Sequence, residues 1–437
     1  MPHPAQTAAA HRVAAILDRA GFEVYLVGGC VRDRLLGLNV HDLDLTTNAR
    51  PADIAALFPA VQEVGVHFGV MLVRLEDAEV QVATFRTEAS YLDGRRPDRV
   101  HFESDVRRDV ARRDFTINAL LENPFTGEVI DHVGGRADLD ARLIRAIGDP
   151  MDRFAEDHLR MLRAIRFAAR LGFAIEPATM AAIRRCAPHI AAISPERVRD
   201  ELSRILTEGH PRRGFELLDK AGLLAVILPE VARMKGVIQP PEFHPEGDVW
   251  IHTLGLLERL ERPSVELALA CLLHDVGKPV TQSFEDRIRF SGHDRLGADI
   301  ARQILARLHY PSSTIEAVCS MVAQHMKFAD ALKMTAATFK RFARQDVFDQ
   351  LLELHRLDLL ASQRPLGNWH AVSQRRASIP VDQLRPAPLL RGQDLIALGY
   401  QPGPLFSRIL TALEEEQLDG RVTSRDQALV WLKRTFG

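Results

Sequence analysis

The chain has 437 residues, of which 46% are hydrophobic and 26% charged, and its formal net charge is −2. This length predicts roughly two to four domains. The near-neutral charge excludes a polybasic nucleic-acid binder, although 56 Lys and Arg residues leave a local basic face open. Four scattered cysteines without a CxxC pair argue against a disulfide scaffold or zinc ribbon. With no leader pattern and no apolar run of the roughly 20 residues that span a bilayer, we expect a cytoplasmic protein that makes no membrane contact.

A short strand, a glycine turn and a helix are predicted near the N-terminus. Apolar residues 24–27 form the strand, which ends at Gly28-Gly29, and helical spacing follows. Next come Asp42 and Asp44, which share one face if the segment is extended. Paired carboxylates repel unless a cation lies between them, and hard oxygen ligands suit magnesium. Singly, such motifs are usually a tight turn and a solvated loop; together they supply the parts that transfer a nucleotide from a triphosphate.

The rest of the first third predicts a mixture of helices and strands. Its elements are an amphipathic helix up to about residue 20, a helix from Pro51, strands at 64–73 and 79–85, a return of Phe102 to the sheet, and a helix at 109–121. Residues 86–99 are polar, basic and rich in turn formers, which predicts a mobile loop. After about residue 140, strand signals nearly vanish. The sequence therefore predicts an α+β fold with a mixed head and an all-helical remainder.

The predicted helix at 109–121 is dense in polar residues. Arg113, Asp114 and Asn118 can share one of its faces. An arginine fork suits triphosphate oxygens, and Asp or Asn can hold ribose hydroxyls. A salt-bridged surface helix explains the same pattern equally well.

A second informative helix covers residues 156–167. Apolar residues form a stripe, and arginines each one residue further ring one edge of it: Arg160, Arg163, Arg166 and Arg170. Asp157 lies three residues before Arg160. A carboxylate accepts from an exocyclic amine while a guanidinium donates to a ring nitrogen or carbonyl, so this pair could hydrogen-bond the edge of a base. An ordinary capped helix with arginines on its wet side is the alternative.

Four motifs, GGCVRD, DLD, RRDFTINA and EDHLRMLRAIRF, occur in an order and spacing that resemble the class II tRNA nucleotidyltransferases. That family includes CCA-adding enzymes, their CC- and A-adding relatives and bacterial poly(A) polymerases, and the resemblance covers about residues 20–230. It implies a polymerase-β-like nucleotidyltransferase head at 1–140, with a mixed, mainly antiparallel sheet. A helical neck and body with base- and RNA-binding helices would follow at 141–235.

The resemblance also implies residue roles. Asp42 and Asp44 would bind the catalytic Mg²⁺ ions, and Asp157 with Arg160 would act as a protein template that pairs with the incoming base. Other residues would bind the nucleotide, namely Gly28, Gly29, Arg32, Arg113, Asp114, Asn118, Arg163 and Arg166. The loop at 86–99 resembles the flexible loop that switches the family from C to A addition and that CC-only members lack. Gln81 departs from the pattern, because many relatives carry Glu there, and Glu79 could substitute.

Histidines and aspartates recur on separate predicted helices of the second half. They are His252, His274, Asp275, His293, His325 and Asp358. Such residues can converge on a metal inside a helix bundle. The array resembles the HD phosphohydrolase superfamily, which implies a domain at 236–375, a divalent transition metal, and hydrolysis of phosphomonoesters or phosphodiesters such as 2′,3′-cyclic ends. A structural bundle without metal is the alternative.

The last segment, 376–437, predicts an amphipathic helical tail. It resembles the C-terminal part of HD-containing nucleotidyltransferases, which implies contact with the acceptor and T arm of tRNA. The leading hypothesis is CCA addition to tRNA from CTP and ATP, with phosphohydrolase side activity. The alternatives are an A-adding enzyme or poly(A) polymerase, an HD hydrolase with an RNA-binding head, and a non-catalytic tRNA-binding module. A homo-oligomer is left open.

Overall fold

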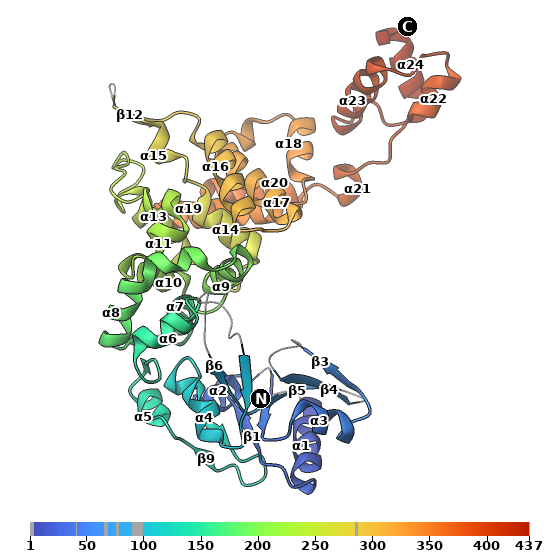
Figure 1. The fold of residues 1–437 in the computed structure, drawn as a ribbon. Coiled ribbons are helices and arrows are strands. Elements are labelled where there is room, and N and C mark those ends of the chain that lie inside the picture. The colour runs from blue at the N-terminus through green and yellow to red at the C-terminus, as the bar shows by residue number, and fades with distance from the viewer. Residues whose placement is uncertain are drawn as a thin grey trace. The chain divides into compact units, whose positions relative to one another are not determined.

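The computed structural model describes residues 4–40, 42–64, 69–75, 78–89, 99–284 and 287–436. The chain divides into two compact units, Met1–Ala232 and Arg233–Gly437. Strands and helices mix in the first unit and helices dominate the second, which confirms the predicted α+β class (Figure 1). The division falls close to the predicted limit at residue 235, while the limits at 140 and 375 stay predictions. Among the residues described, no helix is both long and apolar enough to span a bilayer.

A seven-stranded sheet forms the centre of the first unit. Its order is β3 (Val61–Glu63), β4 (Val70–Leu75), β5 (Ala78–Thr84), β2 (Asp44–Thr47), β1 (Val24–Val27), β8 (Leu121–Glu122) and β9 (Val129–Ile130). Only β2 and β5 pair in parallel; the other neighbours are antiparallel, as predicted. Helix α1 (Pro4–Arg19) packs against this sheet and buries Val13 and Leu17 completely.

The predicted strand, turn and helix near the N-terminus are confirmed. Strand β1 ends at Gly28, whose φ of 82° is a left-handed conformation that glycine adopts without strain. Helix α2 (Gly29–Leu35) begins at once. Strand β2 begins at Asp44, so Asp42 lies just ahead of the strand. Helix α3 (Pro51–Leu57) begins at the expected proline.

The prediction of one helix at 109–121 is wrong. The segment holds the end of α4 (Val106–Ala111), a turn, the 3-10 helix η1 (Thr116–Asn118) and the start of β8. Every residue from 114 to 122 is buried, and a helix with one polar face could not bury all of its sides. The backbone instead pairs with β1 through β8, and Phe115 forms a bridge to Ala146.

The return of Phe102 to the main sheet is also wrong. Strand β7 (Arg99–Phe102) pairs with β6 (Arg86–Ala89) in a separate two-stranded sheet. The loop predicted at 86–99 therefore starts and ends in paired strands. Its residues 90–98 lie outside the described part of the chain.

Helices build the remainder of the first unit. They are α5 (Gly135–Asp140), α6 (Pro150–Glu156), α7 (Arg160–Leu171), α8 (Pro177–Cys186), α9 (Pro195–Thr207), α10 (Pro211–Lys220), α11 (Leu223–Ile227) and α12 (Pro229–Ala232). The predicted helix over 156–167 is broken after Glu156. Asp157 is extended, and its carboxylate accepts a hydrogen bond from the backbone N–H of Leu159 at 3.1 Å. The apolar stripe is confirmed, because Leu162 and Ile165 are completely buried.

The second unit is a helix bundle with one small hairpin, β12 (Gln282–Phe284) and β13 (Ile288–Phe290). Its longer helices are α13 (Val249–Glu258), α14 (Val265–Leu273), α16 (His293–Arg307), α17 (Ser312–Gln324), α18 (Ala336–Ala343), α19 (Phe348–Ala361) and α20 (Gly367–Ala377). Shorter helices lie among them, namely α15 (Lys278–Thr281), α21 (Val381–Leu384) and the 3-10 helices η3 (His325–Ala329) and η4 (Ala331–Lys333).

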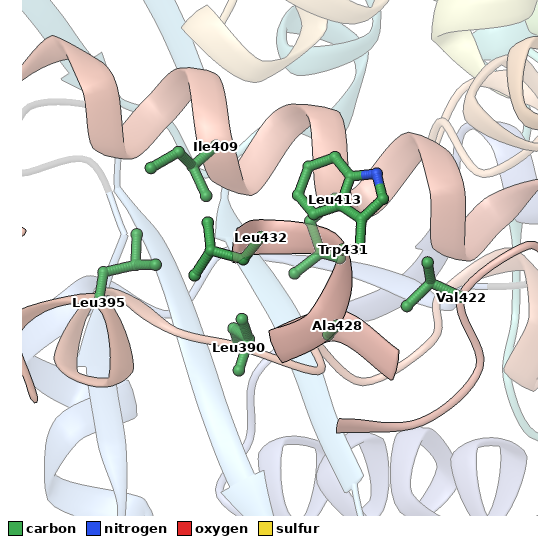
Figure 2. Packing of buried hydrophobic residues seen from close by; sticks show 8 residues of the cluster. All are labelled: Leu390, Leu395, Ile409, Leu413, Val422, Ala428, Trp431 and Leu432. Carbon is green, nitrogen blue, oxygen red and sulfur yellow. The ribbon is translucent and has the colours of Figure 1, made fainter. Parts of the chain in front are cut away.

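The predicted helical tail consists of α22 (Gly392–Ala397), α23 (Pro404–Leu418) and α24 (Arg425–Phe436). It packs around a hydrophobic core of its own, formed by Leu390, Leu395, Ile409, Leu413, Val422, Ala428, Trp431 and Leu432 (Figure 2). Ion pairs from Arg341 to Glu415 (2.9 Å) and from Arg344 to Glu414 (2.7 Å) join α23 to α18.

Candidate nucleotide and metal sites

A cavity of about 790 Å³ lies within the first unit, a size typical of small-molecule sites. Strands β1, β2 and β5 and helices α2, α7 and α9 contribute to its walls. The predicted residues that line it are Gly28, Gly29, Arg32, Asp44, Arg113, Asp114, Asn118, Asp157, Arg160, Arg163 and Arg166. Asp42 is exposed and is not among the lining residues.

Of the two predicted magnesium ligands, Asp44 lines the cavity. Burial and the neighbouring charge of Asp42 raise the pKa of Asp44, although Arg113 opposes the shift. Two carboxylates that disfavour each other's charge are a suitable donor set for a cation. The register of β2 and β5 places Gln81 opposite Asp44, and Gln81 also lines the cavity. Glu79 forms an exposed ion pair with Arg74 at 2.7 Å and does not line it, so the geometry gives Glu79 no part in the site.

Asp109 holds the arginines of one cavity wall. It is completely buried and pairs with Arg112 at 2.6 Å and with Arg113 at 2.9 Å. Burial alone would raise the pKa of Asp109, but the two guanidinium groups outweigh it and lower that pKa. The sequence reasoning missed this residue, although the spacing of four between Asp109 and Arg113 on a helical turn was a usable signal.

A connected polar network holds the other arginines. Arg32 is buried, donates to the side-chain oxygen of Asn118 at 2.5 Å and pairs with Asp33 at 2.6 Å. Asp114 pairs with Arg163 at 2.6 Å and accepts from the amide of Asn118 at 3.1 Å. Burial opposes ionisation of Asp114, yet Arg163 and Asn118 lower its pKa to about 2. The guanidinium groups of Arg32 and Arg163 are therefore held in place by buried partners.

The predicted template residues line the cavity, and each is held by a partner of its own. Arg197 on α9 donates to the carboxylate of Asp157 at 2.8 Å. Arg160 pairs with Glu156 at 2.5 Å. Neither partner was predicted. Glu156 lies only four residues before Arg160 in the sequence and could have been found, whereas Arg197 comes from a distant helix.

The six residues predicted in the second unit converge on one point. His252 Nε2 lies 3.1 Å from Asp358 Oδ1 and 3.3 Å from His274 Nε2. His293 Nε2 lies 3.3 Å from His325 Nε2. Asp275 belongs to two donor groups within the described residues, one with His252 and His274 and the other with His293 and His325. These five residues are buried, and Asp358 is partly exposed.

Every histidine of this cluster has its Nδ1 within 3.0 Å of an oxygen that can only accept. The acceptors are Glu246 Oε1 for His252 and the carbonyl oxygens of Cys271 for His274, of Phe290 for His293 and of Val322 for His325. Each Nδ1 therefore carries the hydrogen, which leaves Nε2 and its lone pair for the cluster. This arrangement fits a metal centre.

The pKa values of His252 and His325 shift in opposite directions in the metal-free cluster. Burial disfavours a charged His252, but its hydrogen bonds to Asp358 and Glu246 raise its pKa to about 9. Burial and the neighbouring His274 lower the pKa of His325 to about 4. Lys278, which the sequence reasoning did not single out, lies with its ammonium nitrogen 2.6 Å from Asp275 Oδ2.

Comparisons with known proteins identify the domains in which the two candidate sites lie. Family models match in chain order the poly A polymerase head domain at 24–145, the probable RNA- and SrmB-binding site of polymerase A at 172–235, and the HD domain at 248–360. Head, cavity and helical second unit therefore define a nucleotidyltransferase of the polymerase A type that carries an HD domain.

Similar proteins narrow this class. The CCA-adding enzyme of Levilactobacillus brevis is 33% identical over 98% of this chain and 97% of its own. The CC-adding tRNA nucleotidyltransferase of Thermus thermophilus is 36% identical over 94% and 93%. The crystal structure of the Bacillus stearothermophilus CCA-adding enzyme in complex with CTP superposes with a TM-score of 0.75, at 27% identity, and covers 99% of this chain and 98% of that one. The chain belongs to the family of CCA-adding tRNA nucleotidyltransferases.

Proposed function

We propose that this protein adds CCA to the 3′ end of tRNA with CTP and ATP as donors. The observation that supports the proposal is that a single cavity is lined by Asp44, Arg113, Asp157 and Arg160. Asp44 would bind metal, Arg113 would bind the triphosphate, and Asp157 with Arg160 would read the base. A site that only bound RNA would have no use for a carboxylate pair beside a nucleotide-sized cavity. The similarity to CCA-adding enzymes over nearly the whole chain supports the same conclusion.

The side chains divide the work of nucleotidyl transfer. Asp42 and Asp44 would hold Mg²⁺, which supplies activation of the attacking 3′-hydroxyl and stabilises the leaving pyrophosphate. Arg113, held by Asp109, neutralises the triphosphate and orients it for in-line attack. Neither task depends on the base.

Base choice would rest on Asp157 and Arg160. Cytosine and adenine both present an exocyclic amine that can donate a hydrogen bond to a carboxylate. Beside it lies a ring nitrogen that can accept a hydrogen bond from a guanidinium. Uracil and guanine present a carbonyl at the place of the amine, which would face the carboxylate of Asp157 unfavourably. The partners Arg197 and Glu156 hold these two groups at fixed positions in the cavity.

Extension of tRNA ends tests the proposal. Full-length protein is incubated with tRNA that ends at the discriminator base, at CC or at CCA, with CTP and ATP supplied separately. We expect two C residues from CTP on the first substrate and one A on the CC end. The similarity to a CC-adding relative makes CC addition the second candidate; growth that stops at CC with both nucleotides present would establish it. A added only to CC ends would indicate an A-adding enzyme, and long A tails a poly(A) polymerase.

We further propose that the second unit holds a divalent transition metal and hydrolyses phosphate esters. The convergence of His252, His274, Asp275 and Asp358 with their Nε2 and carboxylate donors supports this activity. The metal would polarise the phosphate and activate a water. Replacement of His274 and Asp275 by alanine should abolish hydrolysis of p-nitrophenyl phosphate and 2′,3′-cyclic AMP and spare nucleotide incorporation. Unchanged hydrolysis would overturn this proposal.

The tail helices α22–α24 are proposed to contact the tRNA. They form a separate core and carry exposed basic residues, among them Arg425 and Lys433, as expected for a surface that binds duplex RNA by shape and phosphate. A cytoplasmic location stays a prediction. Removal of residues after 385 should weaken tRNA binding and leave CTP binding by the first unit unchanged.

A further inference from the structure

We infer that Glu246 is a positioning residue for the metal centre of the second unit: it holds His252 with Nε2 directed at the donor cluster and thereby sets the affinity for metal. The inference rests on the metal centre proposed above. Glu246 lies in the segment before α13, outside the HD signature residues that were predicted from the sequence.

Contacts of Glu246 connect two histidines. Its Oε1 lies 2.6 Å from His252 Nδ1 and 2.9 Å from His244 Nδ1. The rings of His244 and His252 meet edge to face, with centroids 4.9 Å apart. The side chain of Glu246 is 9% exposed, and its Oε2 is buried with no hydrogen-bond partner among the described residues. A carboxylate that leaves one oxygen unsatisfied in the interior is costly, so its retention calls for a role.

Glu246 acts through His252 rather than as a metal ligand itself. A neutral imidazole offers one lone pair, and the Nε2 of His252 already faces Asp358 at 3.1 Å and His274 at 3.3 Å. The opposite nitrogen must then donate its hydrogen to Glu246. A donor group built on His244, Glu246 and the Nδ1 of His252 would therefore exclude His252 from the main cluster.

The other histidines of the cluster differ from His252 in one respect. His274, His293 and His325 donate from Nδ1 to neutral backbone carbonyl groups. His252 alone among them donates to a charged side chain. A carboxylate makes the imidazole a stronger base toward a metal than a carbonyl does, and loss of such a partner typically weakens metal affinity about 10- to 100-fold.

The test measures metal binding, with Co²⁺ alone as the probe. Metal-free full-length protein is titrated with Co²⁺ by calorimetry and by visible absorption, which reports the coordination geometry. The variants are Glu246→Ala and Glu246→Gln, with Glu242→Gln at an exposed neighbouring position as matched control. A further variant, His252→Ala, should remove the Co²⁺ site that Glu246 is inferred to support. Thermal unfolding of each metal-free protein shows whether the fold is intact.

We expect Glu246→Ala to weaken the tightest Co²⁺ binding about 10- to 100-fold and to alter the absorption spectrum. Glu246→Gln should weaken it less, because its carbonyl still accepts from His252, and Glu242→Gln should leave it unchanged. Wild-type affinity in Glu246→Ala, or in Glu246→Gln if the alanine variant does not fold, would overturn the inference and leave the metal centre standing. If wild-type protein binds no Co²⁺ at all, the proposed metal centre and the inference both fail.

Discussion

Replacement of Asp109 by Asn should lower the stability of the first unit and weaken its binding of CTP and ATP to the same extent. Asp109 is completely buried between two guanidinium groups whose side chains are 17% (Arg112) and 18% (Arg113) exposed. Breaking a buried ion pair by removing one partner costs about 3–5 kcal/mol. The amide oxygen of Asn still accepts one hydrogen bond and water reaches both arginines, so we expect a loss of about 2–3 kcal/mol.

The functional consequence follows from the position of Arg113. Without the carboxylate of Asp109, the guanidinium group of Arg113 is no longer held at the cavity wall. The KM values for CTP and ATP should therefore rise by the same factor, about 10. Hydrogen exchange of the amides in α4 measures the local stability, and single-nucleotide extension of tRNA measures both KM values. Asp105→Asn is the matched control, because Asp105 caps the same helix and Asn caps equally well.

Two results would refute this reasoning. Unchanged exchange rates in α4 would show that the ion pairs of Asp109 contribute nothing to stability. A KM that rises for only one of the two nucleotides would show that this wall of the cavity takes part in reading the base, contrary to the division of work proposed here.

Three further predictions test other parts of the structure. Arg197→Met should increase incorporation of UMP and GMP relative to CMP and AMP, because Asp157 loses the partner that fixes it; unchanged selectivity in a competition assay would contradict this. In metal-free protein, the free energy of unfolding should fall by up to about 3 kcal/mol as the pH rises from 6.5 to 9. The raised pKa of His252 adds stability that is fully present below its unfolded-state pKa of 6.5 and is lost above its folded-state pKa of about 9. His252→Gln should reduce this pH dependence in thermal unfolding. Arg375→Met should destabilise the second unit by about 2 kcal/mol, because Arg375 donates to backbone carbonyls at 2.8 Å, and an unchanged melting temperature would argue against it.

Local sequence was sufficient to predict the glycine turn at Gly28-Gly29. Four apolar residues stand before Gly28-Gly29 and helical spacing follows it, so the pattern was readable even though β1 pairs with the distant strands β2 and β8. The segment 109–121 was not, because its apolar spacing fitted a helix while its true partners, β1 and Ala146, are distant in sequence. Burial on all sides, which decides against a helix there, is a property of the whole unit.

The candidate sites show the same limit. The motifs were sufficient to predict many of the residues that line the cavity and those that form the HD cluster. The residues that hold them in place were missed. Asp109 and Glu156 lie four residues before Arg113 and Arg160, with which they pair, whereas Arg197 reaches Asp157 from another helix. Glu246 is six residues from His252, but nothing in the spacing shows which nitrogen of His252 it meets.

The cavity at Asp44 is proposed to add CCA to tRNA. The most direct measurement is single-nucleotide-resolved extension of a tRNA that lacks its CCA end, by wild-type protein and by the Asp42→Ala, Asp44→Ala double variant. We expect the wild-type protein to add two C residues with CTP alone and a terminal A once ATP is added, and the double variant to add nothing. Extension by the double variant, or wild-type products that never carry the terminal A, would contradict this proposal.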